Sequence, residues 1–68
     1  MQVDRVYDFI SSLMNEIQEE KKVKSENVAL GHMKSFEDYK HQTGVIQGLD
    51  SCLYIIKTLA DKMENSDE

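Results

Sequence analysis

Hydrophobic residues recur at helical spacing in two separate stretches of the chain. In the first stretch they lie three or four positions apart, at Val3, Val6, Tyr7, Ile10, Leu13, Met14 and Ile17. This spacing places them on one face of an amphipathic helix. Asp4 near the start of the stretch and Lys21, Lys22 and Lys24 near its end complement the helix dipole. The pattern predicts a helix over about residues 2–23. Phe9 lies outside its apolar stripe and could be an exposed anchor for a partner.

The second stretch is longer and broader. Its stripe consists of Phe36, Tyr39, Ile46, Leu49, Leu53, Ile56, Ala60 and Met63, widened by Val45, Cys52 and Leu59. Ser35 followed by Asp38 resembles a capping box, with aspartate in place of glutamate. We therefore predict a helix over about residues 35–64 and an acidic tail over 65–68. The helical period fails over about residues 24–34, which we interpret as the connection, with Gly31 as a left-handed helix stop.

Two helices of unequal length predict an all-α fold: a single small domain, residues 1–68, forming a helical hairpin with a long second helix. Both helices rise equally per residue, so the shorter first helix would end opposite roughly Leu53. An apolar interface would then project beyond it, formed by Ile56, Leu59, Ala60 and Met63. This predicts that the hairpin is completed by oligomerisation or by a larger partner protein.

A ridge of small residues at spacing four lies inside the predicted second helix, at Gly44, Gly48 and Cys52. Glycine in a helix interior costs about 1 kcal/mol relative to alanine, so the pair of glycines requires an explanation. A ridge of small residues allows another backbone to approach closely. We predict a helix-packing site, either between two chains or between the two helices of one chain, although short glycine pairs also occur by chance.

Charge and length narrow the classes of partner. The chain has 68 residues and a net charge of -5, which argues against direct binding of nucleic acid or of an anionic membrane. Its longest unbroken apolar run, Cys52–Ile56, is too short to span a bilayer. A single cysteine excludes an internal disulfide, and the first residues lack the features of a signal peptide. We therefore expect a reducing, cytoplasmic environment.

Three groups of residues are candidate sites in the sequence. His41 shares a helix face with Glu37 and Asp38, a set that could hold a metal ion or move a proton, but a solvated, salt-bridging face explains it better. The aliphatic neighbours of Cys52 predict a buried, unreactive thiol.

Tyr54 points away from the main stripe and, with Ile55, could form a second contact surface. We predict no catalytic residue, no bound metal and no cofactor, and therefore not an enzyme.

Residues 36–60 carry a pattern of a tyrosine, a glycine five residues later, a glycine–leucine pair and an aliphatic helix end. The matching positions are Tyr39, Gly44, Gly48, Leu49, Leu53, Ile56 and Leu59. Over about 25 residues this segment resembles short uncharacterised helical proteins encoded in tailed-phage genomes. The resemblance implies a small phage protein encoded among structural or packaging genes, located in the host cytoplasm or the virion. It implies no activity and no catalytic residue.

Together these observations predict a non-enzymatic protein–protein interaction module. The leading hypothesis is a small virion-associated or assembly protein that docks through the apolar face of its second helix. It would bind a second copy of itself, a larger protein, or both. The alternative is a small acidic phage regulatory protein that binds and inhibits a host enzyme or transcription factor, its acidic surface occupying a basic groove.

Overall fold

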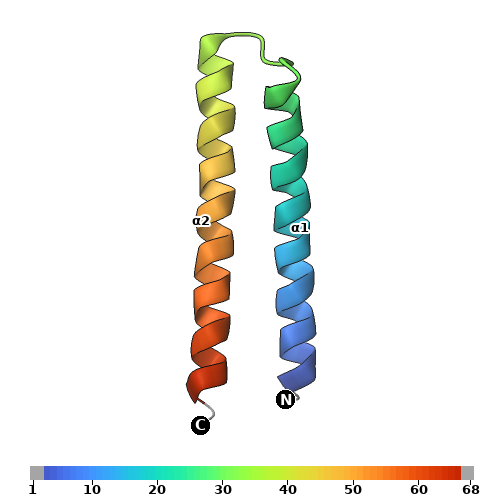
Figure 1. Ribbon diagram of the computed structural model, residues 1–68, viewed down its shortest axis with the longest axis vertical. Helices are drawn as coiled ribbons and strands as arrows, with labels where there is room; N and C mark the ends of the chain where they lie inside the picture. Colours follow the sequence, from blue (N-terminus) through green and yellow to red (C-terminus); the bar gives the residue numbers. More distant parts are fainter. Residues whose placement is uncertain (1–2, 67–68) are drawn as a thin grey trace.

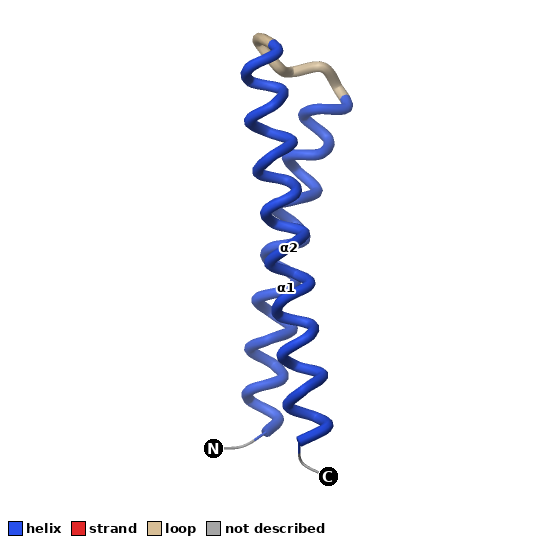
Figure 2. The backbone as a smooth tube through the Cα atoms, turned by 90° about the vertical axis from the view of Figure 1, so that its left-hand side faces the viewer, coloured by secondary structure: helices blue, strands red, loops and turns tan. Residues whose placement is uncertain are grey.

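The chain forms two long antiparallel helices joined by one short connection (Figure 1). In the computed structural model, which describes residues 3–66, α1 spans Val3–Ala29 and α2 spans Phe36–Ser66. The hairpin is long and narrow, with extents of 50 × 16 × 15 Å. Seen edge-on, the two helices cross at a shallow angle (Figure 2). The predicted all-α helical hairpin is confirmed.

The first helix extends well beyond its apolar stripe. It ends at Ala29 and not near residue 23, so the predicted connection over 24–34 is wrong and only residues 30–35 connect the helices. The physical reason is that Lys21 and Lys24 continue the helical spacing after Ile17. Both lysines are half-buried beside α2, as expected when an aliphatic stem covers apolar surface and the ammonium group stays in water. The predicted helix start at residue 2 lies outside the described residues.

A Schellman motif ends α1. Gly31 adopts a φ of 74°, a left-handed conformation that favours glycine. The His32 N–H donates to the Asn27 carbonyl at 3.0 Å, and the Gly31 N–H donates to the Val28 carbonyl at 3.1 Å. These two bonds satisfy carbonyl groups that the helix end would otherwise leave unpaired. The predicted helix stop at Gly31 is confirmed.

The start of α2 is capped by side chains on both sides of the helix boundary. The Asp38 N–H donates to Ser35 Oγ at 3.1 Å, as in a capping box. The Asp38 carboxylate in turn accepts from the Lys34 N–H at 3.2 Å, one residue before the usual donor. At its other end α2 includes Asn65 and Ser66. The last two residues of the predicted acidic tail, 67 and 68, lie outside the described residues.

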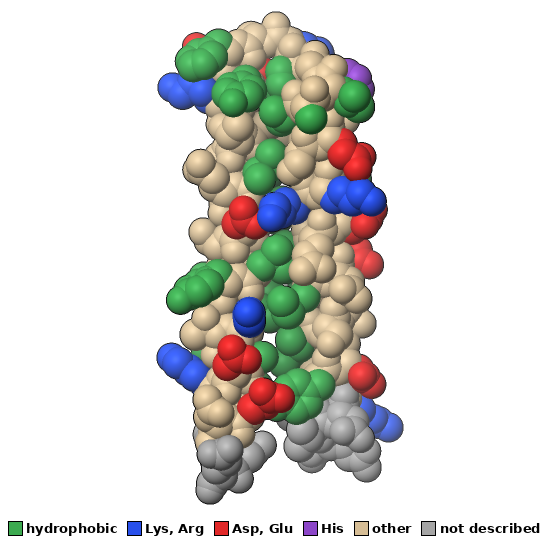
Figure 3. Space-filling model, viewed as in Figure 1, with side chains coloured by type: hydrophobic (Ala, Val, Ile, Leu, Met, Phe, Trp, Pro, Cys, Tyr) green, Lys and Arg blue, Asp and Glu red, His purple; other side chains and the backbone are tan. Residues whose placement is uncertain are grey.

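The two helices pack along one seam that repeats every seven residues, as in a coiled coil. Apolar side chains fill most of this seam where it is visible between the helices (Figure 3). We call these half-buried positions the hairpin seam: Tyr7, Ile10, Met14, Ile17, Lys21, Lys24 and Val28 on α1, with Gln42, Ile46, Leu49, Leu53, Ile56 and Ala60 on α2. No side chain described by the structure is fully buried, because each helix has only one neighbour.

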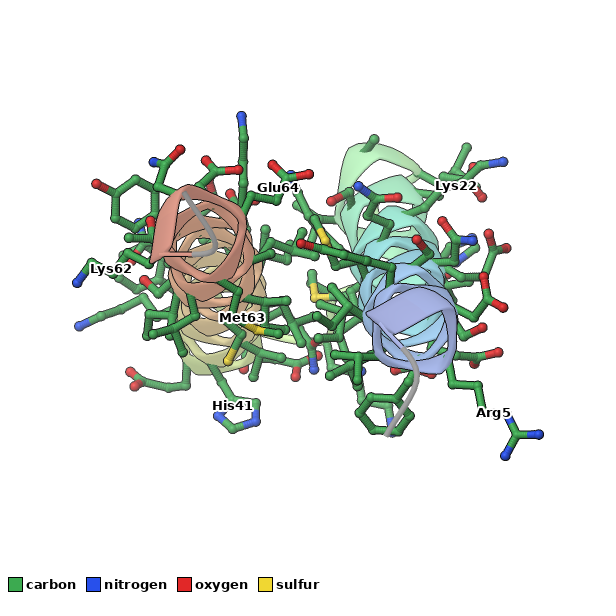
Figure 4. The ribbon with its side chains drawn as sticks, turned by 90° about the horizontal axis from the view of Figure 1, so that it is seen from below. Arg5, Lys22, His41, Lys62, Met63 and Glu64 are labelled. Carbon is green, nitrogen blue, oxygen red and sulfur yellow. The ribbon has the colours of Figure 1, made fainter. Side chains whose placement is uncertain are left out.

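The overhang of α2 predicted from the sequence does not form. The lower ends of the two helices lie at nearly the same level (Figure 1), because the longer α1 reaches further along α2. With 27 and 31 residues, the helices differ by only about 6 Å in length. Ile56 and Ala60 are half-buried beside α1, and Met63 lies between the helix ends (Figure 4). Of the four predicted interface residues, Leu59 has the largest exposed fraction, at 54%.

Candidate docking surface

One flank of the hairpin seam is polar. Lys21 Nζ forms an ion pair with Asp50 Oδ1 at 2.5 Å, which links α1 to α2 on this flank. Thr43 and Lys57 lie seven positions before and after Asp50 and so share its side of α2. This polar flank belongs to the face of the molecule seen in Figure 3.

The opposite flank of α2 carries a second apolar stripe. We call it the apolar flank: Val45, Gly48, Cys52, Ile55 and Leu59, at spacings of three and four. At 3.6 residues per turn it lies about a quarter turn around α2 from the hairpin seam. Val45 is half-buried and the other four residues are exposed, with Ile55 exposed by 55% and Leu59 by 54%. The helix therefore has two adjacent apolar faces, and α1 covers only one of them.

The first helix adds apolar side chains to the same side of the hairpin. Val6 and Leu13 directly precede seam positions of α1, as Val45, Cys52 and Leu59 do on α2. The two antiparallel helices are related by an approximate twofold axis perpendicular to the plane of the hairpin. Rotation about this axis exchanges the helices but not the two faces of the hairpin. Residues that directly precede seam positions therefore lie on the same face in both helices.

Phe9, exposed by 67%, lies four residues before Leu13, which is exposed by 38%. We call the apolar flank together with Phe9 and Leu13 the docking face. The sequence singled out Phe9 and Ile55 separately, and only the antiparallel register brings them to one side.

Charge is scarce along the α2 part of this face. Between Thr43 and Ile56 the single charged residue is Asp50, in a chain in which 31% of residues are charged. Asp50 is directed to the polar flank, where it pairs with Lys21. Depletion of charge at the centre is typical of protein–protein interfaces, whereas a solvated helix face carries charges throughout.

The predicted ridge of small residues lies at this surface and is open. A methyl group added at Gly44 or Gly48 would meet no atom of the chain within 4 Å outside its own helix backbone and chain neighbours. The alternative in which the ridge packs the two helices of one chain is therefore wrong. Cys52 is exposed, so the predicted burial of its thiol is also wrong. Both corrections have one cause: the ridge faces away from α1.

The other candidate residues do not assemble into a chemical site. His41 is exposed and projects to the side opposite Glu64 (Figure 4). Among residues 3–66, no three histidine, cysteine or acidic side chains come together in a way that could hold a metal ion. Tyr54 is exposed by 72% but lies outside the apolar flank, so the predicted pair of Tyr54 and Ile55 is divided between two faces.

A small aromatic group lies beside the connection, at the start of α2. The rings of Phe36 and Tyr39 stack with their centres 6.3 Å apart. Lys40 Nζ lies 5.7 Å from the centre of the Phe36 ring, within the range of a cation–π contact. These contacts stay within the first turn of α2 and add to the order of the helix start.

Comparisons with protein-family models, with curated proteins and with solved structures found no match to this chain. None of the helices in the described residues is long and apolar enough to cross a membrane.

Proposed function

We propose that the chain is a non-enzymatic protein–protein interaction module that docks through its docking face. The observation that carries this proposal is the second apolar stripe of α2, which α1 leaves exposed except at the half-buried Val45 and which contains no charged residue. Monomeric proteins rarely expose contiguous apolar surface of this kind unless a partner covers it. The exposed side chains of Ile55, Leu59 and Phe9 are large enough to act as anchors in a partner's pockets.

The biological setting follows from the resemblance of residues 36–60 to short helical proteins of tailed phages. On that basis we propose a virion-associated or assembly protein, located in the host cytoplasm during assembly or in the particle. Its docking face would seat it on a second copy or on a larger protein of the particle.

A second candidate function is supported by the outer surface of α1. Glu16, Glu19, Glu20 and Glu26 are all exposed there, and the whole chain carries a net charge of -5. Such a surface favours a partner with a basic groove. The chain would then act as a free regulator that inhibits a host enzyme or transcription factor.

Two substitutions at adjacent positions test the docking face. Ile55→Glu places a charge on the apolar flank, whereas Tyr54→Glu, the matched control, places the same charge on an exposed aromatic outside it. Both positions are exposed, so both variants should stay helical by circular dichroism. We expect purified phage particles to contain the wild type and Tyr54→Glu in a constant copy number and to lack Ile55→Glu.

Absence of the wild type from particles, with Ile55-dependent capture of one host protein, would favour the regulator. If Ile55→Glu enters particles or binds the host protein as well as Tyr54→Glu does, the docking face is not the binding surface.

A further inference from the structure

We infer that the apolar flank of α2 is covered by a second copy of this chain, with the α2 helices of the two copies packed antiparallel against each other. This inference rests on the proposed docking function and names its partner. It makes the second copy an isologous partner, which presents the same patch around a twofold axis.

The exposed area of the hairpin matches what a dimer would bury. The chain exposes 5516 Å², whereas a compact folded monomer of 7.9 kDa exposes about 4,400 Å². The excess is about 1,100 Å² per chain, and a standard protein–protein interface buries about 800 Å² per partner. One interface of ordinary size would therefore remove most of this excess, about 800 of about 1,100 Å², so one copy is sufficient as partner.

The apolar flank is complementary to itself when one copy is inverted. An antiparallel pairing centred on Cys52 sets Ile55 of one copy opposite Gly48 of the other, and Leu59 opposite Val45, because each pair is equally spaced about the centre to within one residue. Ile55 then meets the small Gly48 and Leu59 meets the shorter Val45, so bulk on one copy is matched by less bulk on the other, as close packing requires. A parallel pairing would set Ile55 against Ile55 and Gly48 against Gly48, which crowds one level and leaves a gap at the other.

The surroundings of the flank favour contact through α2 over contact through α1. Gly48 within the apolar flank and Ser51 at its outer border are both small and exposed, so two α2 backbones can approach closely there. On α1 the corresponding side carries Glu16 and Glu20 between its apolar residues. In a twofold arrangement these carboxylates would approach their own copies, which disfavours a close α1–α1 contact.

The mass of the chain in solution is the first test, by sedimentation equilibrium from about 1 to 200 µM. We expect the wild type and Tyr54→Glu to have twice the mass of one chain. For Ile55→Glu we expect self-association weakened at least about 30-fold, as for an interface hot spot. Circular dichroism at equal concentration checks that each variant remains helical.

The single cysteine tests the geometry. A twofold axis at Cys52 brings the two thiols within disulfide range, for which Cα atoms must lie about 4.4–6.8 Å apart. Copper-phenanthroline in air should therefore convert the wild type to a disulfide-linked dimer. The control variant Gln47→Cys in a Cys52→Ser background moves the thiol to another exposed face of α2 and should not be cross-linked.

A wild-type mass of one chain over this range would overturn the inference. The proposed function would survive that result if particle or host binding still depended on Ile55. A dimer that withstands Ile55→Glu, or a dimer whose Cys52 thiols fail to cross-link, would overturn the antiparallel α2 contact.

Discussion

The same substitution, glycine to alanine, should have opposite effects at two positions of this hairpin. In α2, Gly44→Ala adds a methyl group where no atom lies within 4 Å outside its own helix backbone and chain neighbours. The folded state should therefore gain the helix propensity difference, about 1 kcal/mol, without a steric penalty. In the connection, Gly31 has a φ of 74°, which alanine adopts only at a cost of about 1–2 kcal/mol.

Both effects are large enough to measure by thermal unfolding followed at 222 nm. For a domain of this size, 1 kcal/mol corresponds to a shift of about 4–8 °C in Tm. We expect Gly44→Ala to raise Tm by about that amount and Gly31→Ala to lower it by at least as much. All variants must be compared at one protein concentration, since the Tm of an associating chain depends on concentration.

A lower Tm for Gly44→Ala would refute this reasoning, because it would show that another backbone occupies the space beside Gly44. An unchanged or higher Tm for Gly31→Ala would contradict the left-handed conformation at the end of α1. The double variant should lie close to the sum of the two single effects, since Gly44 and Gly31 share no contact partner.

Two further predictions concern polar groups of the hairpin. Ser35→Ala removes the side-chain oxygen that accepts from the Asp38 N–H and should lower the free energy of unfolding by about 1 kcal/mol in urea titrations. The control, Ser12→Ala, lies at an exposed position in the middle of α1 and should leave the free energy of unfolding equal or slightly higher. A double-mutant cycle of Lys21→Ala and Asp50→Ala should give a coupling energy below about 1 kcal/mol that falls toward zero in 1 M NaCl, because both side chains are partly exposed to solvent, by 36% and 54%. A coupling that persists in high salt would show that this ion pair is shielded from solvent.

The second helix could be predicted closely because its signals are local. Ser35 and Asp38 mark its start through hydrogen bonds within one turn, and its apolar spacing continues to Met63. The end of α1 could not be found in the same way. The next two seam positions after Ile17 are lysines, whose charge indicates a solvent-exposed position although their stems are half-buried. That one error shortened α1, lengthened the connection and created the overhang of α2 that the structure lacks.

The docking face depended on information that a single helix pattern does not contain. The spacing of apolar residues predicts a broad stripe on α2, but it does not show which of these residues α1 covers. The antiparallel register assigns Ile56 and Ala60 to the hairpin seam and leaves Ile55 and Leu59 outside it. The open space beside Gly48 then excludes packing within the chain as the reason for that glycine.

The seam itself explains why a hairpin of this kind should depend on a partner. Its half beside the connection contains Lys21, Lys24 and Gln42, so that half gains little from apolar burial. The other half is apolar, yet none of its described side chains is fully buried. A chain of this length rarely gains more than about 3–5 kcal/mol from its own core. Covering the apolar flank would add apolar burial beside the half of the seam that is already apolar. Docking and folding should therefore stabilise each other, and a variant that loses the partner should also unfold at a lower temperature.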